Sequence, residues 1–257
     1  MSESSSSRRS MSPDHYFLRS QEPLQSLIFM APLIVLYEVG AVLYTTDPHT
    51  GHRVSNLARS FMKDFLELFG AVGDYLPGLA VVLVLLAWHV ARRDRLRFDP
   101  RLYFAMAIES LALAIPLLMF GLLIGPRQAA GYTAAAPDLS TMTWQAGVVF
   151  SIGAGVYEEL VFRLAAIAIL HMVFVDMLAV PEKRGAILAV VCSAILFAAY
   201  HFSAGDQFTW PKFVFYFAAG IYFAVLYVMR GFGIVVATHA FYDVLVIAIS
   251  KGLWTAS

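Results

Sequence analysis

Seven long apolar stretches, separated by short polar or charged segments, dominate the pattern of the chain. A helix that spans a bilayer needs about 20 mainly apolar residues. The stretches cover residues 24–44, 75–90, 102–124, 143–175, 186–202, 213–229 and 234–253. They predict an all-α, polytopic transmembrane helix bundle of about 7–8 spans around a polar intramembrane cavity. The prediction allows an eighth span because the stretch 143–175 is too long to cross the bilayer once without strong tilt or extension beyond the hydrocarbon core.

The segments outside these stretches differ in character. Residues 1–22 are polar and rich in Ser, which favours a disordered cytoplasmic tail. Within 45–70, apolar residues recur at three-to-four spacing among Arg, Lys, Asp and Glu, the pattern of an amphipathic helix at a membrane interface. We therefore divide the chain into the tail 1–22, N-terminal transmembrane helices over 23–140 and a C-terminal transmembrane core over 141–253.

Composition and loop charge agree with a membrane protein. The chain is 60% hydrophobic and 14% charged, against about 25% charged in a soluble domain. Most Lys and Arg fall in alternate loops on the side of the N-terminus, at positions 8, 9, 19, 92, 93, 95, 97, 101, 183, 184 and 230. By the positive-inside rule this places the N-terminus in the cytoplasm. The compact chain mildly favours a bacterial cytoplasmic (inner) membrane, and no stripe typical of nucleic-acid binding is present.

The segment Gly155–Arg163, GVYEELVFR, places three charges within an apolar stretch. Each charge deep in a bilayer costs at least ~2.5–3.5 kcal/mol and is by default a functional hypothesis. Glu159 and Arg163 are four apart, the spacing at which a helix pairs a Glu with a following cation. Glu158 points about 100° away from Glu159 around the helix, so it remains available to take a proton from water.

Two later apolar stretches supply imidazoles. His201 follows Phe197 by four residues, and His239 and Asp243 are four apart on the last stretch. Each group alone fits a structural role: an ion pair, an interfacial histidine or a packing hydrogen bond. Together, on three spans, they favour function over packing.

These residues resemble the CPBP family of intramembrane endopeptidases, which includes the type II CAAX prenyl proteases, the Abi proteins and bacteriocin-processing homologues. The family signature EExxxR, FxxxH and HxxxN reads here as Glu158 to Arg163, Phe197 to His201 and His239 to Asp243. The resemblance covers residues 145–250 and implies a glutamate-dependent protease that requires no metal. It implies that Glu158 activates a water held by His201.

In the same family scheme, Glu159 and Arg163 position the centre, and His239 and Asp243 stabilise the oxyanion. Asp243 departs from the family's Asn, because an ionised carboxylate cannot donate to an oxyanion. Asp243 is then either protonated in its apolar setting or orients His239 by accepting its N–H; we expect the second.

The predicted function is therefore an intramembrane endopeptidase of a membrane-associated peptide or protein. Two alternatives stay open. Glu158, His201 and His239 form a plausible Zn²⁺ ligand set for a metal-dependent hydrolase, and a non-catalytic immunity or scaffold protein, or a transporter with a proton relay, would also place charges in the membrane. The sequence does not define the substrate or the oligomeric state.

Overall fold

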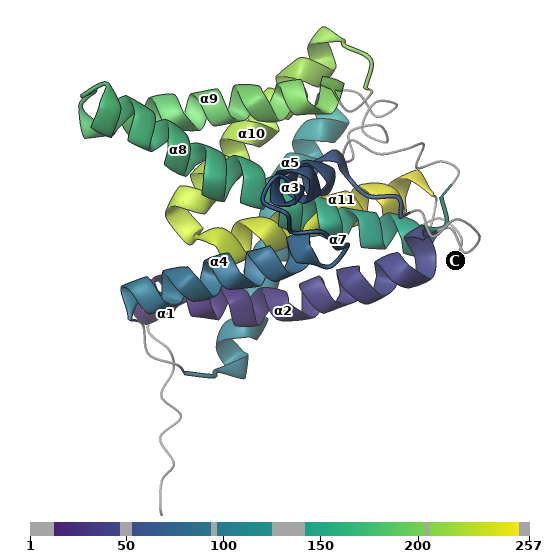
Figure 1. Ribbon diagram of the computed structural model, residues 1–257. Coiled ribbons are helices and arrows are strands. Elements are labelled where there is room, and N and C mark those ends of the chain that lie inside the picture. The colour runs from purple at the N-terminus through teal and green to yellow at the C-terminus, as the bar shows by residue number, and fades with distance from the viewer. Residues whose placement is uncertain (1–12, 47–52, 94–96, 125–141, 204–205, 252–257) are drawn as a thin grey trace, which may run out of the picture.

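Helices are the main secondary structure of the described residues, and the only β-pairing among them is one isolated bridge between Thr46 and Arg53. The computed structural model (Figure 1) describes residues 13–46, 53–93, 97–124, 142–203 and 206–251. The N-terminal helices are α1 (Pro13–Ser20), α2 (Pro23–Gly40) with the π-helix η1 (Ala41–Thr45), α3 (Leu57–Glu67), α4 (Leu76–Arg92) and α5 (Pro100–Ile124). The later elements are α7 (Trp144–Glu159), η2 (Leu160–Ala166), α8 (Ile167–His171), η3 (Met172–Met177), α9 (Glu182–Ser203), α10 (Trp210–Arg230) and α11 (Phe232–Ser250).

The predicted membrane-spanning pattern is confirmed. Within the described residues, six helical runs are long and apolar enough to cross a bilayer, at Pro23–Thr45, Pro100–Ile124, Trp144–Met177, Glu182–Ser203, Trp210–Arg230 and Phe232–Ser250. A seventh apolar helix, α4, has 17 residues, which is at the short end of the spanning range of about 17–25 residues. The fold is thus the all-α polytopic bundle that the hydrophobic pattern predicts.

The long fourth stretch is one helical run, so the structure does not divide it into two spans. Its 34 residues continue through α7, η2, α8 and η3. Thr143 caps its start by accepting a hydrogen bond from the backbone N–H of Ala146 at 3.2 Å. Two π-helical segments interrupt the α geometry, and the first begins directly after Glu159. Such segments are rare in helices and frequent at functional sites.

Helix α11 is the centre of the bundle. It packs against α2, α5, α7 and α10, and its first nine residues, Phe232 to Ala240, are all buried. In Figure 1, α7 and α11 lie in a middle layer between α8 and α9 on one side and α2 and α4 on the other. A side chain on the N-terminal half of α11 is therefore surrounded by protein on every side.

Residues 13–20 differ from our expectation of a disordered tail, because they form helix α1. The helix is tied to the bundle where Tyr16 donates to Glu109 on α5, and Glu109 pairs with Arg230 at 2.5 Å. Burial and the adjoining Glu109 carboxylate raise the pKa of Tyr16, which keeps its hydroxyl protonated as a donor. Residues 1–12 of the predicted tail lie outside the described chain.

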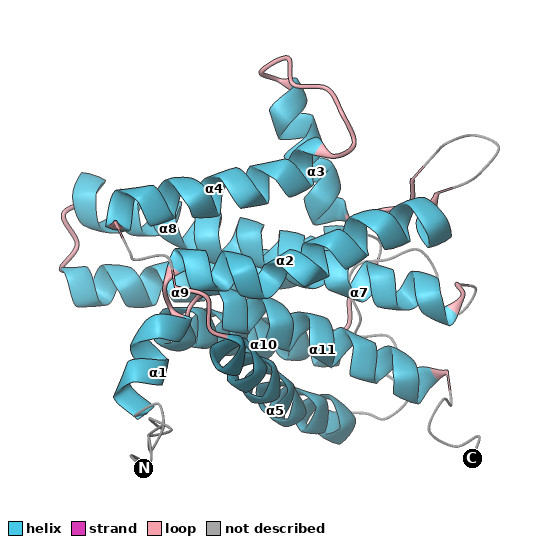
Figure 2. Ribbon diagram, turned by 90° about the horizontal axis from the view of Figure 1, so that it is seen from below, coloured by secondary structure: helices cyan, strands magenta, loops and turns pink. Residues whose placement is uncertain are grey.

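The amphipathic segment forms α3, a helix shorter than the 45–70 stretch that predicted it. Asn56 caps it by accepting from the N–H of Arg59 at 2.9 Å. The helix packs against α4 and α7 and projects from the body of the bundle toward the top of Figure 2. Phe61 and Phe65 of this helix are exposed.

Candidate active site

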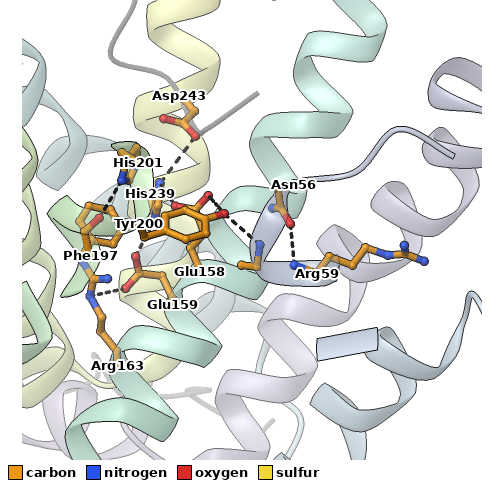
Figure 3. Close-up of polar contacts among 11 residues, drawn as sticks. Asn56, Arg59, Glu158, Glu159, Arg163, Phe197, Tyr200, His201, His239 and Asp243 are labelled. Carbon is orange, nitrogen blue, oxygen red and sulfur yellow. Dashed lines mark hydrogen bonds and ion pairs between the residues drawn. The ribbon is translucent and has the colours of Figure 1, made fainter. Parts of the chain in front are cut away.

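The six predicted site residues converge from three helices onto one buried cluster. Glu158 and Glu159 end α7, Arg163 lies in η2, His201 lies near the end of α9, and His239 and Asp243 lie on α11. Figure 3 shows these side chains pointing toward a common centre. All are buried, and Glu158, Glu159 and Arg163 have no exposed surface. Charges buried to this extent require close partners.

Glu159 links two of the predicted groups. Its Oε2 lies 2.9 Å from Nε of Arg163, the ion pair that the four-residue spacing predicts, and its Oε1 lies 2.7 Å from Nδ1 of His239. The Arg163 guanidinium also lies 4.2 Å from the centre of the Phe197 ring, a distance suited to a cation–π contact. One carboxylate therefore holds both a guanidinium and an imidazole.

The two carboxylate oxygens of Glu158 differ in their surroundings: one accepts a hydrogen bond and the other does not. Its Oε1 accepts a hydrogen bond from the hydroxyl of Tyr200 at 3.2 Å. Its Oε2 has no hydrogen-bond partner within the part of the chain that the structure describes, and lies 3.9 Å from Nε2 of His239. Oε2 is consequently the oxygen that can accept a further proton.

His201 is fixed by its own helix and by an aromatic neighbour. Its Nδ1 lies 2.9 Å from the carbonyl oxygen of Phe197. A carbonyl oxygen can only accept, so Nδ1 carries the proton in this contact and Nε2 of the neutral ring keeps its lone pair. The imidazole stacks on Tyr216 of α10 with 4.0 Å between ring centres. The ring is thereby fixed with Nε2 as an acceptor.

Asp243 does not take the place that we expected for it. Its Oδ2 lies 3.6 Å from Nε2 of His239, which is too long for a hydrogen bond. Glu159 contacts the other ring nitrogen instead, and so orients His239. The reason is the close packing of α7 on α11, which brings Glu159 nearer to the ring than the residue four positions along the same helix.

Gly155 permits this close packing. A Cβ atom at Gly155 would lie 2.7 Å from the carbonyl oxygen of Val236 and 2.9 Å from the amide nitrogen of Ala240, both backbone atoms of α11. Any larger residue would force the two helix backbones apart. Because Glu159 is one helical turn from Gly155 and His239 is adjacent to Ala240, this contact sets the distance between carboxylate and imidazole.

We predict that Gly155→Ala lowers stability by about 1–3 kcal/mol through overpacking and reduces any activity of the site. Thermal unfolding in detergent and a functional assay would measure the two effects. The matched control is Gly147→Ala on the same face of α7, where the added Cβ would meet only the Ile247 side chain at 3.2 Å or more. Equal effects of the two substitutions would contradict this role of Gly155.

A metal site is not formed by these residues as they lie. No group of three or more His, Cys, Asp or Glu side chains in the described ranges is arranged to hold a metal ion. In particular, Glu158, His201 and His239, the ligand set proposed for zinc, do not make such a group. The site is instead connected by ion pairs, hydrogen bonds and ring contacts.

Several residues of the site were not predicted. Tyr200 contacts Glu158, Tyr216 stacks on His201, and the Ser193 hydroxyl donates to the Phe162 carbonyl of η2 at 2.6 Å. A signal for Tyr200 was present, since a tyrosine hydroxyl in an apolar span needs a hydrogen-bond partner and this one directly precedes His201.

Two other acids within the apolar helices have partners of their own. Glu38 pairs with Arg53 at 3.1 Å and accepts from Tyr157, while Glu109 pairs with Arg230. Neither contacts the six site residues. The catalytic hypothesis therefore concerns only the cluster of α7, α9 and α11.

The fold and this cluster define the class of the protein: a multi-pass integral membrane protein with an acid–histidine site buried among its helices. We then compared the chain with models of known protein families. Residues 138–245 match the family model of Rce1-like type II CAAX prenyl endopeptidases, so this region of the chain is similar to that family. The match spans all six site residues and confirms the resemblance seen in the three motifs. The helices before residue 138 lie outside it.

No curated protein matches the chain. No solved structure matches it either. At the level of the family, the match supports a CAAX-protease-like membrane endopeptidase.

Proposed function

We propose that the protein is an intramembrane endopeptidase that hydrolyses peptide bonds of a membrane-associated substrate with a water activated by Glu158. The observation that carries the proposal is the pair of adjacent glutamates with separate partners. Glu159 has a close partner at each oxygen, Arg163 at 2.9 Å and His239 at 2.7 Å, whereas Oε2 of Glu158 has no hydrogen-bond partner among the described residues and lies 3.9 Å from Nε2 of His239. One carboxylate supports the site and its neighbour is available as a base.

In this mechanism Glu158 and His201 hold the attacking water. Oε2 of Glu158 accepts a proton from the water as it attacks the carbonyl carbon. Nε2 of His201 accepts the second water hydrogen, because its Nδ1–H is already directed to Phe197. Two acceptors fix the oxygen lone pair of the water toward the peptide, which supplies the orientation that hydrolysis requires.

The developing oxyanion needs donors, and His239 can supply one. With Nδ1–H donated to Glu159, Nε2 has a proton to donate only when the ring is an imidazolium. The Glu159 carboxylate at 2.7 Å stabilises that cation, and the nearby Glu158 adds to its stabilisation. The role of Glu159 toward His239 is then that of a carboxylate that orients and supports a catalytic imidazole.

Asp243 fits this scheme as a neutral carboxylic acid that donates a second hydrogen bond to the oxyanion. Because Glu159 already orients His239, the orienting role is filled, and a buried acid beside two glutamates is suited to remain protonated. Asp243→Asn preserves a neutral donor, so we predict a kcat within about tenfold of wild type, whereas Asp243→Ala loses about a hundredfold or more. Equal losses in the two variants, measured as peptide cleavage per folded molecule, would contradict the donor role.

The test of the proposed function is proteolysis in a membrane by the purified protein. Wild type and Glu158→Gln would be reconstituted in liposomes with a library of membrane-associated peptides, with and without a chelator. Cleavage that the variant loses and that the chelator leaves unchanged supports the proposal. Cleavage that is abolished by the chelator favours a metal-dependent hydrolase, and a biological function that survives both Glu158→Gln and His201→Ala indicates a non-catalytic protein.

A further inference from the structure

The hydroxyl of Tyr200 connects the Glu158 carboxylate to the backbone of α3. We infer that Tyr200 is a positioning residue: it fixes Glu158 with Oε2 directed into the site, and it is itself held by the first turn of α3. This inference rests on the proposed role of Glu158 as the base. It assigns part of the active site to the N-terminal region, which lies outside the family match.

The directions of the two hydrogen bonds follow from their partners. The backbone N–H of Ala58 donates to the Tyr200 oxygen at 2.9 Å, and the distance from that oxygen to Oε1 of Glu158 is 3.2 Å. A backbone N–H can only donate, so the tyrosine oxygen accepts from Ala58 and its single proton is directed to Glu158. Figure 3 shows the tyrosine between Glu158 and the start of α3.

The start of α3 explains why this N–H is available. The first four N–H groups of an α-helix lack partners within the helix. Asn56 satisfies the N–H of Arg59, and the Asn56 carbonyl satisfies that of Ser60 at 3.2 Å. Ala58 is fully buried, and its backbone N–H donates to the Tyr200 hydroxyl oxygen. The Asn56 cap thus fixes which turn of α3 meets Tyr200.

The tyrosine ring is held independently of its hydroxyl. It packs edge-on against Phe162 and His201, with ring centres 5.2 and 5.3 Å apart, and against Phe61 of α3 at 6.4 Å. A phenylalanine at position 200 would keep these contacts and lose only the oxygen. The effect of the hydroxyl can therefore be measured without removing the ring.

Fixing Oε1 matters because a carboxylate has two equivalent oxygens and rotates freely when neither is bound. With Oε1 bound to Tyr200, the carboxylate plane is set and Oε2 faces Nε2 of His239 at 3.9 Å. A base held in one orientation avoids the cost of ordering it in each reaction. Loss of the hydroxyl should therefore slow the chemical step and leave substrate binding nearly unchanged.

The experiment compares Tyr200→Phe with Tyr222→Phe in the reconstituted full-length protein. Tyr222 is the matched control, because its hydroxyl also makes a hydrogen bond inside the bundle, to the Leu113 carbonyl at 2.7 Å, but away from the site. For Tyr200→Phe we expect kcat to fall by about tenfold to a hundredfold, the range for a hydrogen bond to a charged group. KM and the thermal midpoint should stay close to wild type, and Tyr222→Phe should keep the wild-type kcat.

An unchanged kcat in Tyr200→Phe would overturn the inference, and so would a loss of kcat that Tyr222→Phe shares in equal measure. A change confined to KM would also overturn it, because a positioning residue for the base acts on the chemical step. Glu158→Gln, measured alongside, separates this inference from the proposed function. If Glu158→Gln is inactive while Tyr200→Phe is fully active, only the role of Tyr200 fails; if Glu158→Gln still cleaves, the proposed function fails.

Discussion

Glu158→Gln is expected to lower kcat for peptide cleavage by about a hundredfold to ten-thousandfold, the usual contribution of a general base. The amide has nearly the same shape as the carboxylate and can still receive the Tyr200 hydrogen bond, but it cannot take a proton from water. KM should change little, because the substitution removes no contact that binds substrate in the ground state. Initial rates over a range of peptide concentrations would give both constants.

The control for this prediction is Glu67→Gln, which removes a carboxylate from an exposed position of α3 and should leave the rate unchanged. The thermal midpoint of Glu158→Gln should be equal to or above that of wild type, because a buried carboxylate whose nearest cationic partner, His239, lies 3.9 Å away and is held more closely by Glu159 is replaced by a neutral group. Wild-type cleavage by correctly inserted Glu158→Gln would exclude Glu158 as the base.

Arg163→Met is expected to lower the free energy of unfolding by about 3–5 kcal/mol, as found when one partner of a buried ion pair is removed. The loss leaves the fully buried Glu159 with His239 as its only polar partner within the described structure. Methionine retains much of the apolar packing against Phe197 and Phe223, so the measured loss reports mainly the charge. Denaturant or thermal unfolding in detergent would measure it.

Two further variants serve as controls for the effect of Arg163→Met on stability. Arg184→Met removes a guanidinium from an exposed position and should change stability by less than about 0.5 kcal/mol. The double variant Glu159→Gln/Arg163→Met removes both charges and should recover part of the stability that Arg163→Met loses. Cleavage should not recover with it, because His239 then lacks its carboxylate. An Arg163→Met protein as stable as wild type would show that the pair contributes nothing to the fold.

Much of the fold and part of the site can be predicted from local sequence spacing. Apolar stretches of suitable length locate the membrane helices, and the four-residue interval between Glu159 and Arg163 predicts their ion pair. The same interval places Phe197 beside His201, whose ring centres are 4.7 Å apart. These features depend only on helical periodicity, which the sequence contains directly.

Contacts between helices were not predictable in the same way. The approach of Glu159 to His239 depends on Gly155 against the α11 backbone, and the Tyr200 link depends on where α3 lies relative to α9. We expected Asp243 to orient His239 because it is four residues away on the same helix. Local sequence spacing does not show that α7 brings Glu159 closer to the imidazole. The π-helical geometry around Arg163 also has no signal in the hydrophobic pattern.

The complete burial of Glu158 has a kinetic consequence. A peptide cannot reach a carboxylate with no exposed surface, so an enzyme with this site must open before each turnover and close around its substrate. The observed rate would then contain the fraction of molecules in the open form as a multiplying factor. A substitution far from the glutamates that shifts this opening equilibrium would change turnover without altering the chemistry.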